Sequence, residues 1–339
     1  MIRIDAENAR LQSRTNYLIA AGALKRGWGV TVPYLPSPHM VIARGDGSPE
    51  LHVFSATPPT TSYADAHFVD NKYGTYKLLE SNGIEQLDTA LLSRDGDNTE
   101  VIKDLLGQYE KIVIKPIDGG HGRGISVDVS SLGEAMEAIE HAAANSRSSQ
   151  KVIAQQQFML SDIRDLRVLT IGRKFIAALE RIPARVRGDG THTIEELILL
   201  ENQKDYRGKP YYAKLATIDI ARSKEYLGDA FTTIPSAGME VTVLGVANYG
   251  AGGELRDCTD QIPDWMKEES ERASELLGLD VAGVDYLTDG PLRSDTPHGS
   301  CRAVISEVNK CPALSIHDFP TEGKSRGATE AYLDFIAQL

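Results

Sequence analysis

The sequence has few cysteines, and their spacing gives them no structural role. Only three occur among 339 residues, Cys258, Cys301 and Cys311, and no two of them form a Cys-x-x-Cys pair. An odd number of isolated cysteines excludes a disulfide framework and provides no zinc-binding spacing. Such cysteines are typical of a reducing compartment, and we therefore expect a cytoplasmic protein.

Long apolar runs and excess positive charge are also missing. No stretch approaches the roughly 18 uninterrupted apolar residues of a membrane-spanning helix, and residues 1–7 lack the basic and then apolar build of a secretory signal. Lysine and arginine total 36 against 48 acidic residues, a net charge of −12. This charge repels duplex nucleic acid, although a few lysines with a divalent cation can still bind a nucleotide. We expect neither a membrane nor a nucleic-acid partner.

Helix and strand signals are mixed along the chain and predict an α/β or α+β enzyme of several subdomains. Helices are expected from Leu11 to Gly27 and from Asn71 to Gly83, and the proline-containing segment between them is interpreted as loop-rich. Short apolar or alternating runs predict strands at residues 111–115, 152–154, 166–171, 174–179, 241–246, 281–287 and 303–308.

Two helix starts carry a capping-box spacing. Ser131 is followed by Glu134, and Thr193 by Glu196, each at the beginning of an apolar periodic run. A further helix is expected from Trp265 to Leu277. These signals place the later strands between helices.

A glycine-rich stretch follows the first buried strand. Residues 118–124 read DGGHGRG, and Lys115 lies at the end of the strand before them. Backbone amides in such a loop can surround phosphate oxygens. The stretch lacks the dinucleotide pattern because Ile125 replaces its last glycine, and Gly323 is no P-loop glycine because Asp318 lies five residues before it. A flexible hairpin tip remains the alternative.

Carboxylates interrupt two otherwise apolar strands near the C-terminus. Glu307 and Asn309 lie on one face of the later strand, and Asp285 lies in the earlier one. If the strands pair as a hairpin, Asp285 comes beside Glu307. Carboxylate and amide oxygens suit Mg²⁺, although polar residues on a solvated face are the alternative.

Two arginines occur in consecutive predicted strands. Arg167 lies in an alternating strand and Arg181 at the end of the next. A guanidinium group matches the oxygens of a carboxylate or a transferring phosphoryl group. Surface ion pairs are the alternative for both.

Taken in order, these segments resemble the ATP-grasp superfamily and, within it, the central domain of cyanophycin synthetases. Glutathione synthetases and ribosomal-protein glutamate ligases are more distantly similar. The segment ERIPARVRGDGTHTIEELI at residues 180–198 carries the most specific likeness, and residues 247–253, 279–285 and 307–314 add to it. The resemblance covers about residues 70–339.

The resemblance implies an ATP-grasp fold with a short N-terminal α/β domain. It divides the chain into an N-terminal domain at 1–70, a first ATP-grasp subdomain with a glycine-rich flap at 71–155, and a second subdomain with the metal and substrate site at 156–339. ATP and Mg²⁺, or Mn²⁺ in its place, are the implied cofactors.

The resemblance also implies residue roles, by position in its motifs. Phosphate binding is implied for Lys72, Lys115, Gly119, Gly120, His121, Gly122 and Gly124. Adenine and ribose binding is implied for Gln156, Gln157, Phe158, Met159 and Asp165. Metal binding is implied for Asp285, Glu307 and Asn309. Contact with the reacting phosphoryl, acyl or substrate groups is implied for Arg167, Arg181 and Asn248.

Three departures from the cyanophycin synthetase pattern concern the substrate. Leu244 stands where an arginine is expected, Gly250 and Ala251 replace Ser-Thr, and residues 289–302 look like an insertion. We therefore do not expect a cyanophycin polymerase.

The implied reaction is ADP-forming ligation of a carboxylate and an amino-acid amine through an acyl phosphate. Its partners are small amino-acid or peptide substrates, and a homodimer is left open. One alternative is a ligase that modifies a ribosomal peptide, with the first seventy residues binding the leader. The other is a non-catalytic ATP-binding sensor.

Overall fold

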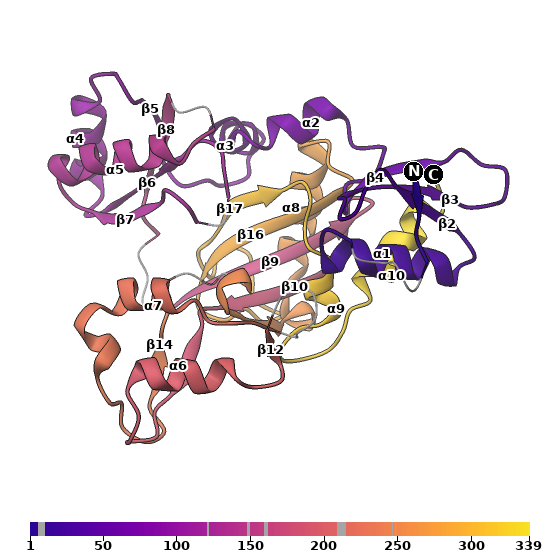
Figure 1. Cartoon of the computed structure of the whole chain (residues 1–339). Helices are drawn as coiled ribbons and strands as arrows, with labels where there is room; N and C mark the ends of the chain where they lie inside the picture. The colour runs from indigo at the N-terminus through magenta and orange to yellow at the C-terminus, as the bar shows by residue number, and fades with distance from the viewer. Residues whose placement is uncertain are drawn as a thin grey trace.

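The computed structural model describes residues 1–5, 11–120, 122–147, 150–158, 162–208, 215–245, 247 and 249–339. In this part of the chain, three sheets of four or five strands are antiparallel throughout, as expected for the α+β class. Figure 1 shows the five-stranded sheet in the middle, with the N-terminal sheet and the other four-stranded sheet on opposite sides of it.

The N-terminal sheet contains strands that the loop-rich interpretation missed. Its order is β1 (Ile2–Arg3), β2 (Gly29–Val32), β3 (His39–Ala43) and β4 (Leu51–Phe54). The prolines that suggested loops lie between β2 and β3 and after β4, so none of them interrupts a hydrogen-bonded ladder. In β4, residues alternate between buried and exposed, which is the pattern of a sheet with one covered face.

The second sheet forms a lobe with its own core. Its order is β5 (Thr89–Ser93), β8 (Lys151–Gln156), β6 (Ile112–Pro116) and β7 (Ser126–Val129). Helices α4 (Thr99–Gln108) and α5 (Leu132–Ala144) pack against it. The predicted capping box of α5 forms only in half, because Ser131 accepts from the Glu134 N–H while the Glu134 carboxylate accepts from Ser130.

The central sheet runs in the order β15 (Glu254–Asp257), β10 (Lys174–Ile182), β9 (Ile163–Ile171), β16 (Val281–Asp289) and β17 (Ala303–Asn309). Helix α8 (Asp264–Leu276) covers one face, where Met266 packs with Val168 and Val284. Side chains alternate along a strand, so Arg167, next to Val168, and Asp285, next to Val284, point to the opposite face of the sheet. The register of the strands therefore decides which charged side chains on that face lie opposite each other.

The described residues between 184 and 251 form a lobe inserted between β10 and β15, which we call the arm. Its elements are β11 (Arg185–Arg187), α6 (Ile194–Asn202), β12 (Arg207–Gly208), β13 (Leu215–Ala216), α7 (Ile220–Leu227), η1 (Gly228–Thr232), β14 (Glu240–Thr242) and η2 (Tyr249–Ala251). The arm has its own apolar core around Ile198 and Phe231. The capping box of Thr193 and Glu196 is confirmed, whereas the strand expected at 241–246 ends at Thr242. Figure 1 shows the arm on the same side of the central sheet as the second sheet.

The two ends of the chain share one core with the central sheet. Helix α10 (Ala328–Ile336) packs on α1 (Arg14–Lys25), and Leu333 lies in the same cluster as Ile19 and Leu169 of β9. The termini lie close together in Figure 1. The three-part division at residues 70 and 155 stays a prediction. Among the described helices, none is long and apolar enough to cross a membrane.

The shared core can be tested at Leu169, which is fully buried. We expect Leu169→Ala to lower the free energy of unfolding by about 2–5 kcal/mol, because the cavity adds to the lost transfer free energy. The control Leu199→Ala lies in the arm at 44% exposure, and there we expect a change within about 0.5 kcal/mol. Urea denaturation measures the free energy of unfolding of both variants. Equal decreases in the two variants would contradict the placement of Leu169 in the shared core.

Candidate active site

Charged side chains form a row across the central sheet. Asp285 pairs with Arg167 on one side and with Glu307 on the other, and on β10 Leu179 stands opposite Arg167. Residues opposite each other in antiparallel strands share a face of the sheet. The predicted hairpin of the two acidic strands is therefore confirmed, and it places Arg167 beside the carboxylates.

Asp285 is enclosed by cationic donors. Its side chain is 1% exposed and accepts from both Nε and Nη2 of Arg167, the latter at 2.9 Å. Arg181 Nη2 lies 3.0 Å from its Oδ2, and Asn309 Nδ2 lies at 3.3 Å. Burial alone would disfavour the ionised form, but the two guanidinium groups outweigh it and hold the pKa of the Asp285 carboxyl below its ordinary value.

Asp165 belongs to the same cluster. Its Oδ1 lies 2.6 Å from Arg181 Nη2, so Arg181 is held between two carboxylates, those of Asp165 and Asp285. Burial raises the pKa of the Asp165 carboxyl, and the Arg181 charge opposes this. The implied ribose contact of Asp165 stays a prediction, since this structure pairs its carboxylate with an arginine.

Lys72 links the glycine-rich stretch to the acidic strand. Asn71 caps α3 (Lys72–Ser81) by accepting from the Gly74 N–H at 2.9 Å, which makes Lys72 the first residue of the helix. The Lys72 ammonium donates to the Gly119 carbonyl at 2.8 Å and lies 3.3 Å from Glu307 Oε1. The Glu307 side chain is 32% exposed, so its carboxylate remains accessible.

Lys115 is buried on β6 and held by two side chains that the sequence had not singled out. Its Nζ donates to Tyr76 Oη at 3.0 Å and to Gln155 Oε1 at 2.7 Å. Burial lowers the pKa of Lys115 to about 8, with help from the nearby Lys72 charge and against the pull of Glu307. Tyr76 is a buried residue of α3. In the sequence, only its spacing could have indicated a role at the site: Tyr76 follows Lys72 by four residues, which places both side chains on the same side of a helix.

The glycine-rich stretch connects β6 and β7, which pair antiparallel. Gly119, Gly122 and Gly124 have φ values of +111°, +71° and +73°, which other residues rarely adopt. At Gly124 a Cβ atom would lie 2.6 Å from the Asn145 Cβ, so this position has no room for a side chain. Of the other implied residues of the stretch, Gly120 has open space around it, and His121 lies outside the described residues. A phosphate flap and a hairpin tip are both compatible with this geometry.

The implied adenine hinge begins at Gln156, the last residue of β8. Arg302 contacts two of its residues, donating to Gln156 Oε1 at 3.3 Å and lying 5.3 Å from the ring centroid of Phe158. Gln157 is tied to β7, because its Oε1 accepts from the Asp128 N–H at 2.7 Å. Two further implied residues, Met159 and Asn248, lie outside the described residues. Arg302 is the last residue of the expected insertion, which therefore borders the hinge.

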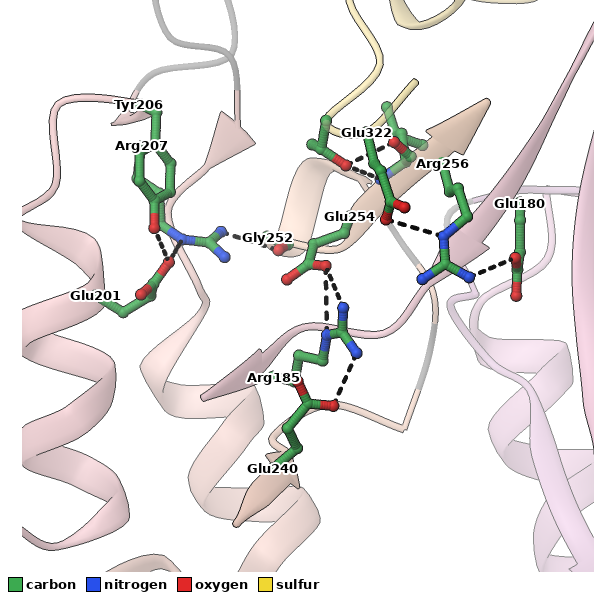
Figure 2. A network of polar contacts seen from close by, with 12 residues as sticks. Glu180, Arg185, Glu201, Tyr206, Arg207, Glu240, Gly252, Glu254, Arg256 and Glu322 are labelled. Atoms are coloured by element: carbon green, nitrogen blue, oxygen red, sulfur yellow. Dashed lines mark hydrogen bonds and ion pairs between the residues drawn. The ribbon is translucent and has the colours of Figure 1, made fainter. Parts of the chain in front are cut away.

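Arginine–carboxylate pairs hold the loop before β15, as Figure 2 shows. Arg207, whose side chain is 1% exposed, pairs with Glu201 at 2.8 Å and donates to the Gly252 carbonyl at 3.0 Å. Arg185 reaches Glu254 at 3.1 Å. Because Gly252 also has a φ of +102°, both its conformation and its carbonyl are constrained. The arm and this loop therefore form one connected unit.

The departure at Leu244 has a physical explanation. Leu244 is 2% exposed and packs in the apolar core of the arm. An arginine there would have to bury its charge, which costs several kcal/mol without a partner. The substitution of leucine for arginine is thus consistent with the packing of this arm.

The oxygen donors of the site fit a hard divalent cation. Asp285, Glu307 and Asn309 lie together at the edge of the central sheet, and two of them are carboxylates. Among the described residues, no group of three or more His, Cys, Asp or Glu could hold a metal, so an amide oxygen is needed to complete this set. Both Asp285 oxygens are occupied by arginines, which leaves Glu307 as the accessible carboxylate.

Known proteins resemble this chain in sequence and in fold. Residues 82–192 match the model of the ATP-grasp domain of prokaryotic glutathione synthetase. The cyanophycin synthetase of Geminocystis herdmanii is 32% identical over 306 residues, which cover 89% of this chain and 34% of that protein. The bifunctional glutathione biosynthesis protein of Clostridium perfringens is 31% identical over 335 residues, covering 96% of this chain and 41% of that protein.

A solved structure shows the same fold. The bifunctional glutathione synthetase of Pasteurella multocida superposes with a TM-score of 0.67 at 23% identity, over 96% of this chain and 44% of that one. The chain thus spans between a third and a half of the length of these relatives. Its motifs, its matching segment and its fold agree, and the chain belongs to the ATP-grasp superfamily.

Proposed function

We propose that this chain catalyses ATP-dependent amide-bond formation between a carboxylate and an amino-acid amine. The carboxylate attacks the γ-phosphate to give an acyl phosphate and ADP, and the amine then displaces phosphate. The observation that carries the proposal is the position of Lys72, whose ammonium lies 3.3 Å from Glu307 Oε1 of the central sheet and donates to the Gly119 carbonyl of the glycine-rich stretch. The three cysteines, none in a disulfide, support a cytoplasmic location.

The residues divide the work by charge. Lys72 and Lys115 neutralise phosphate oxygens, and Glu307 and Asn309 would hold Mg²⁺ with Asp285 behind them. When bound, the ion neutralises phosphate charge and orients the transferring group. Arg167 and Arg181 are already fixed by carboxylates, so they can stabilise developing charge without reorganising.

Trapping of the acyl phosphate tests the reaction directly. With ATP, Mg²⁺ and a panel of amino acids and dipeptides, we expect phosphate release that requires the carboxylate, and hydroxamate formation when hydroxylamine replaces the amine. Glu307→Gln should abolish both while the protein stays folded, because a neutral amide compensates less Mg²⁺ charge. The control Glu322→Gln removes a charge from a side chain that is 65% exposed, and should change neither. ATP binding without phosphate release on any substrate would favour the sensor.

Arg181 should matter more in the transition state than for nucleotide binding. Arg181→Lys keeps the charge but loses the planar guanidinium group, which donates to Asp165 from both Nε and Nη2. We expect turnover to fall at least about tenfold, or about 1.4 kcal/mol of transition-state stabilisation, with nearly unchanged ATP affinity. The control Arg173→Lys, at a pair with Asp280 and 42% exposed, should behave as wild type. Weaker ATP binding with normal turnover at saturation would instead assign Arg181 to the nucleotide pocket.

The buried Lys115 predicts a pH dependence of ATP affinity. Its pKa in the free protein is lowered to about 8, and bound phosphate favours the charged ammonium. Below that pH the lysine is charged before and after binding. Above it, binding must take up a proton, so affinity should fall by up to about tenfold per pH unit. Calorimetry in two buffers of different ionisation enthalpy detects the proton, and Lys115→Met should remove this dependence. A constant affinity from about pH 7 to about pH 9 would contradict the assignment.

A further inference from the structure

Three side-chain contacts join α3 and the segment just before it to β17 and the residue just after it. Just before the helix, Asp70 Oδ2 lies 2.7 Å from Lys310 Nζ. At its first residue, Lys72 lies 3.3 Å from Glu307. One turn later, Tyr76 Oη donates to the Ser306 carbonyl at 2.5 Å. The first two contacts are ion pairs at partly exposed side chains, whereas the third is made by a buried tyrosine.

The Tyr76 hydroxyl joins two sheets. Tyr76 is 1% exposed, and its Oη accepts from the Lys115 ammonium of β6 while it donates to the backbone of β17. A phenol has one proton to donate and lone pairs to accept, so both bonds can form at once. Burial, with the nearby negative charges of Glu307 and Asp285, raises the pKa of Tyr76, so the hydroxyl keeps its proton.

The geometry points to Tyr76 as a positioning residue. Its hydroxyl fixes the Lys115 ammonium against the backbone that carries Glu307. The distance between the phosphate-binding lysine and the metal-binding carboxylate is thereby kept constant. This inference rests on the proposed function. Ser306 directly precedes Glu307, so a bond to its carbonyl constrains the residue that presents the carboxylate. Gln155, the other partner of Lys115, belongs to the second sheet and provides no such link.

A purely structural role gives a different expectation. Tyr76 also packs with Ile117 and Ile153, and phenylalanine would keep that packing. If packing were its only role, Tyr76→Phe would change neither nucleotide binding nor its pH dependence. If the hydroxyl positions Lys115, its removal takes away one acceptor of the ammonium and one donor to the Ser306 carbonyl.

The test compares Tyr76→Phe with Tyr332→Phe, a buried tyrosine whose hydroxyl has no partner among the described residues. For Tyr76→Phe we expect the Kd and KM for ATP·Mg²⁺ to rise about tenfold, since hydrogen bonds to charged groups have this magnitude. We expect kcat at saturation to change less than the KM, and the loss of affinity to begin at a lower pH than in wild type. Tyr332→Phe should leave all of these unchanged.

A double-mutant cycle shows whether Tyr76 acts through Lys115. In a Lys115→Met background, Tyr76→Phe should cause no further loss of ATP affinity. That background has no buried ammonium to leave unpaired, so it also serves if the single variant folds poorly. The inference is overturned if the losses of ATP affinity of the two single variants add in the double variant, or if the Tyr76→Phe protein binds ATP like wild type. Neither result affects the proposed function. A wild-type protein that binds no ATP overturns the proposed function with it.

Discussion

The burial of Asp285 is the constraint on which the site depends. A carboxylate that is 1% exposed can stay ionised only beside fixed positive charge, because its desolvation costs several kcal/mol. The register of the central sheet supplies that charge by placing Arg167 directly opposite, and Arg181 approaches from the next strand. The same arrangement immobilises both guanidinium groups, and fixed donors are suited to phosphoryl transfer.

The proposed site also requires that the second sheet and the central sheet keep a fixed position relative to each other. Each carries part of the proposed nucleotide site, and α3 connects them by side-chain contacts at Lys72 and Tyr76. Because Lys72 also donates to Gly119, one helix start touches the glycine-rich stretch and the acidic strand together. The arm is joined to the loop before β15, where Arg207 donates to the Gly252 carbonyl.

Local signals predicted local structure well and failed where tertiary partners decide. The capping box at Thr193 formed as expected, because both of its partners lie within one helical turn. At Ser131 the same spacing gave half a box, because the Glu134 carboxylate found Ser130 instead. The N-terminal strands were missed because their turns contain prolines and the strands are short. Their stability comes from packing in the core shared with α10 rather than from local propensity.

The residue types and their order were enough to indicate the superfamily, the glycine-rich stretch, and the hairpin that joins Asp285 to Glu307. These features depend on the order of residue types within single strands and loops, and that order is visible in the sequence itself. The pairing of Arg181 with two carboxylates and the role of Tyr76 depend on strand register and on contacts between residues that are distant in sequence. Only the folded chain could decide them, because a side chain's partners follow from packing rather than from its neighbours in sequence.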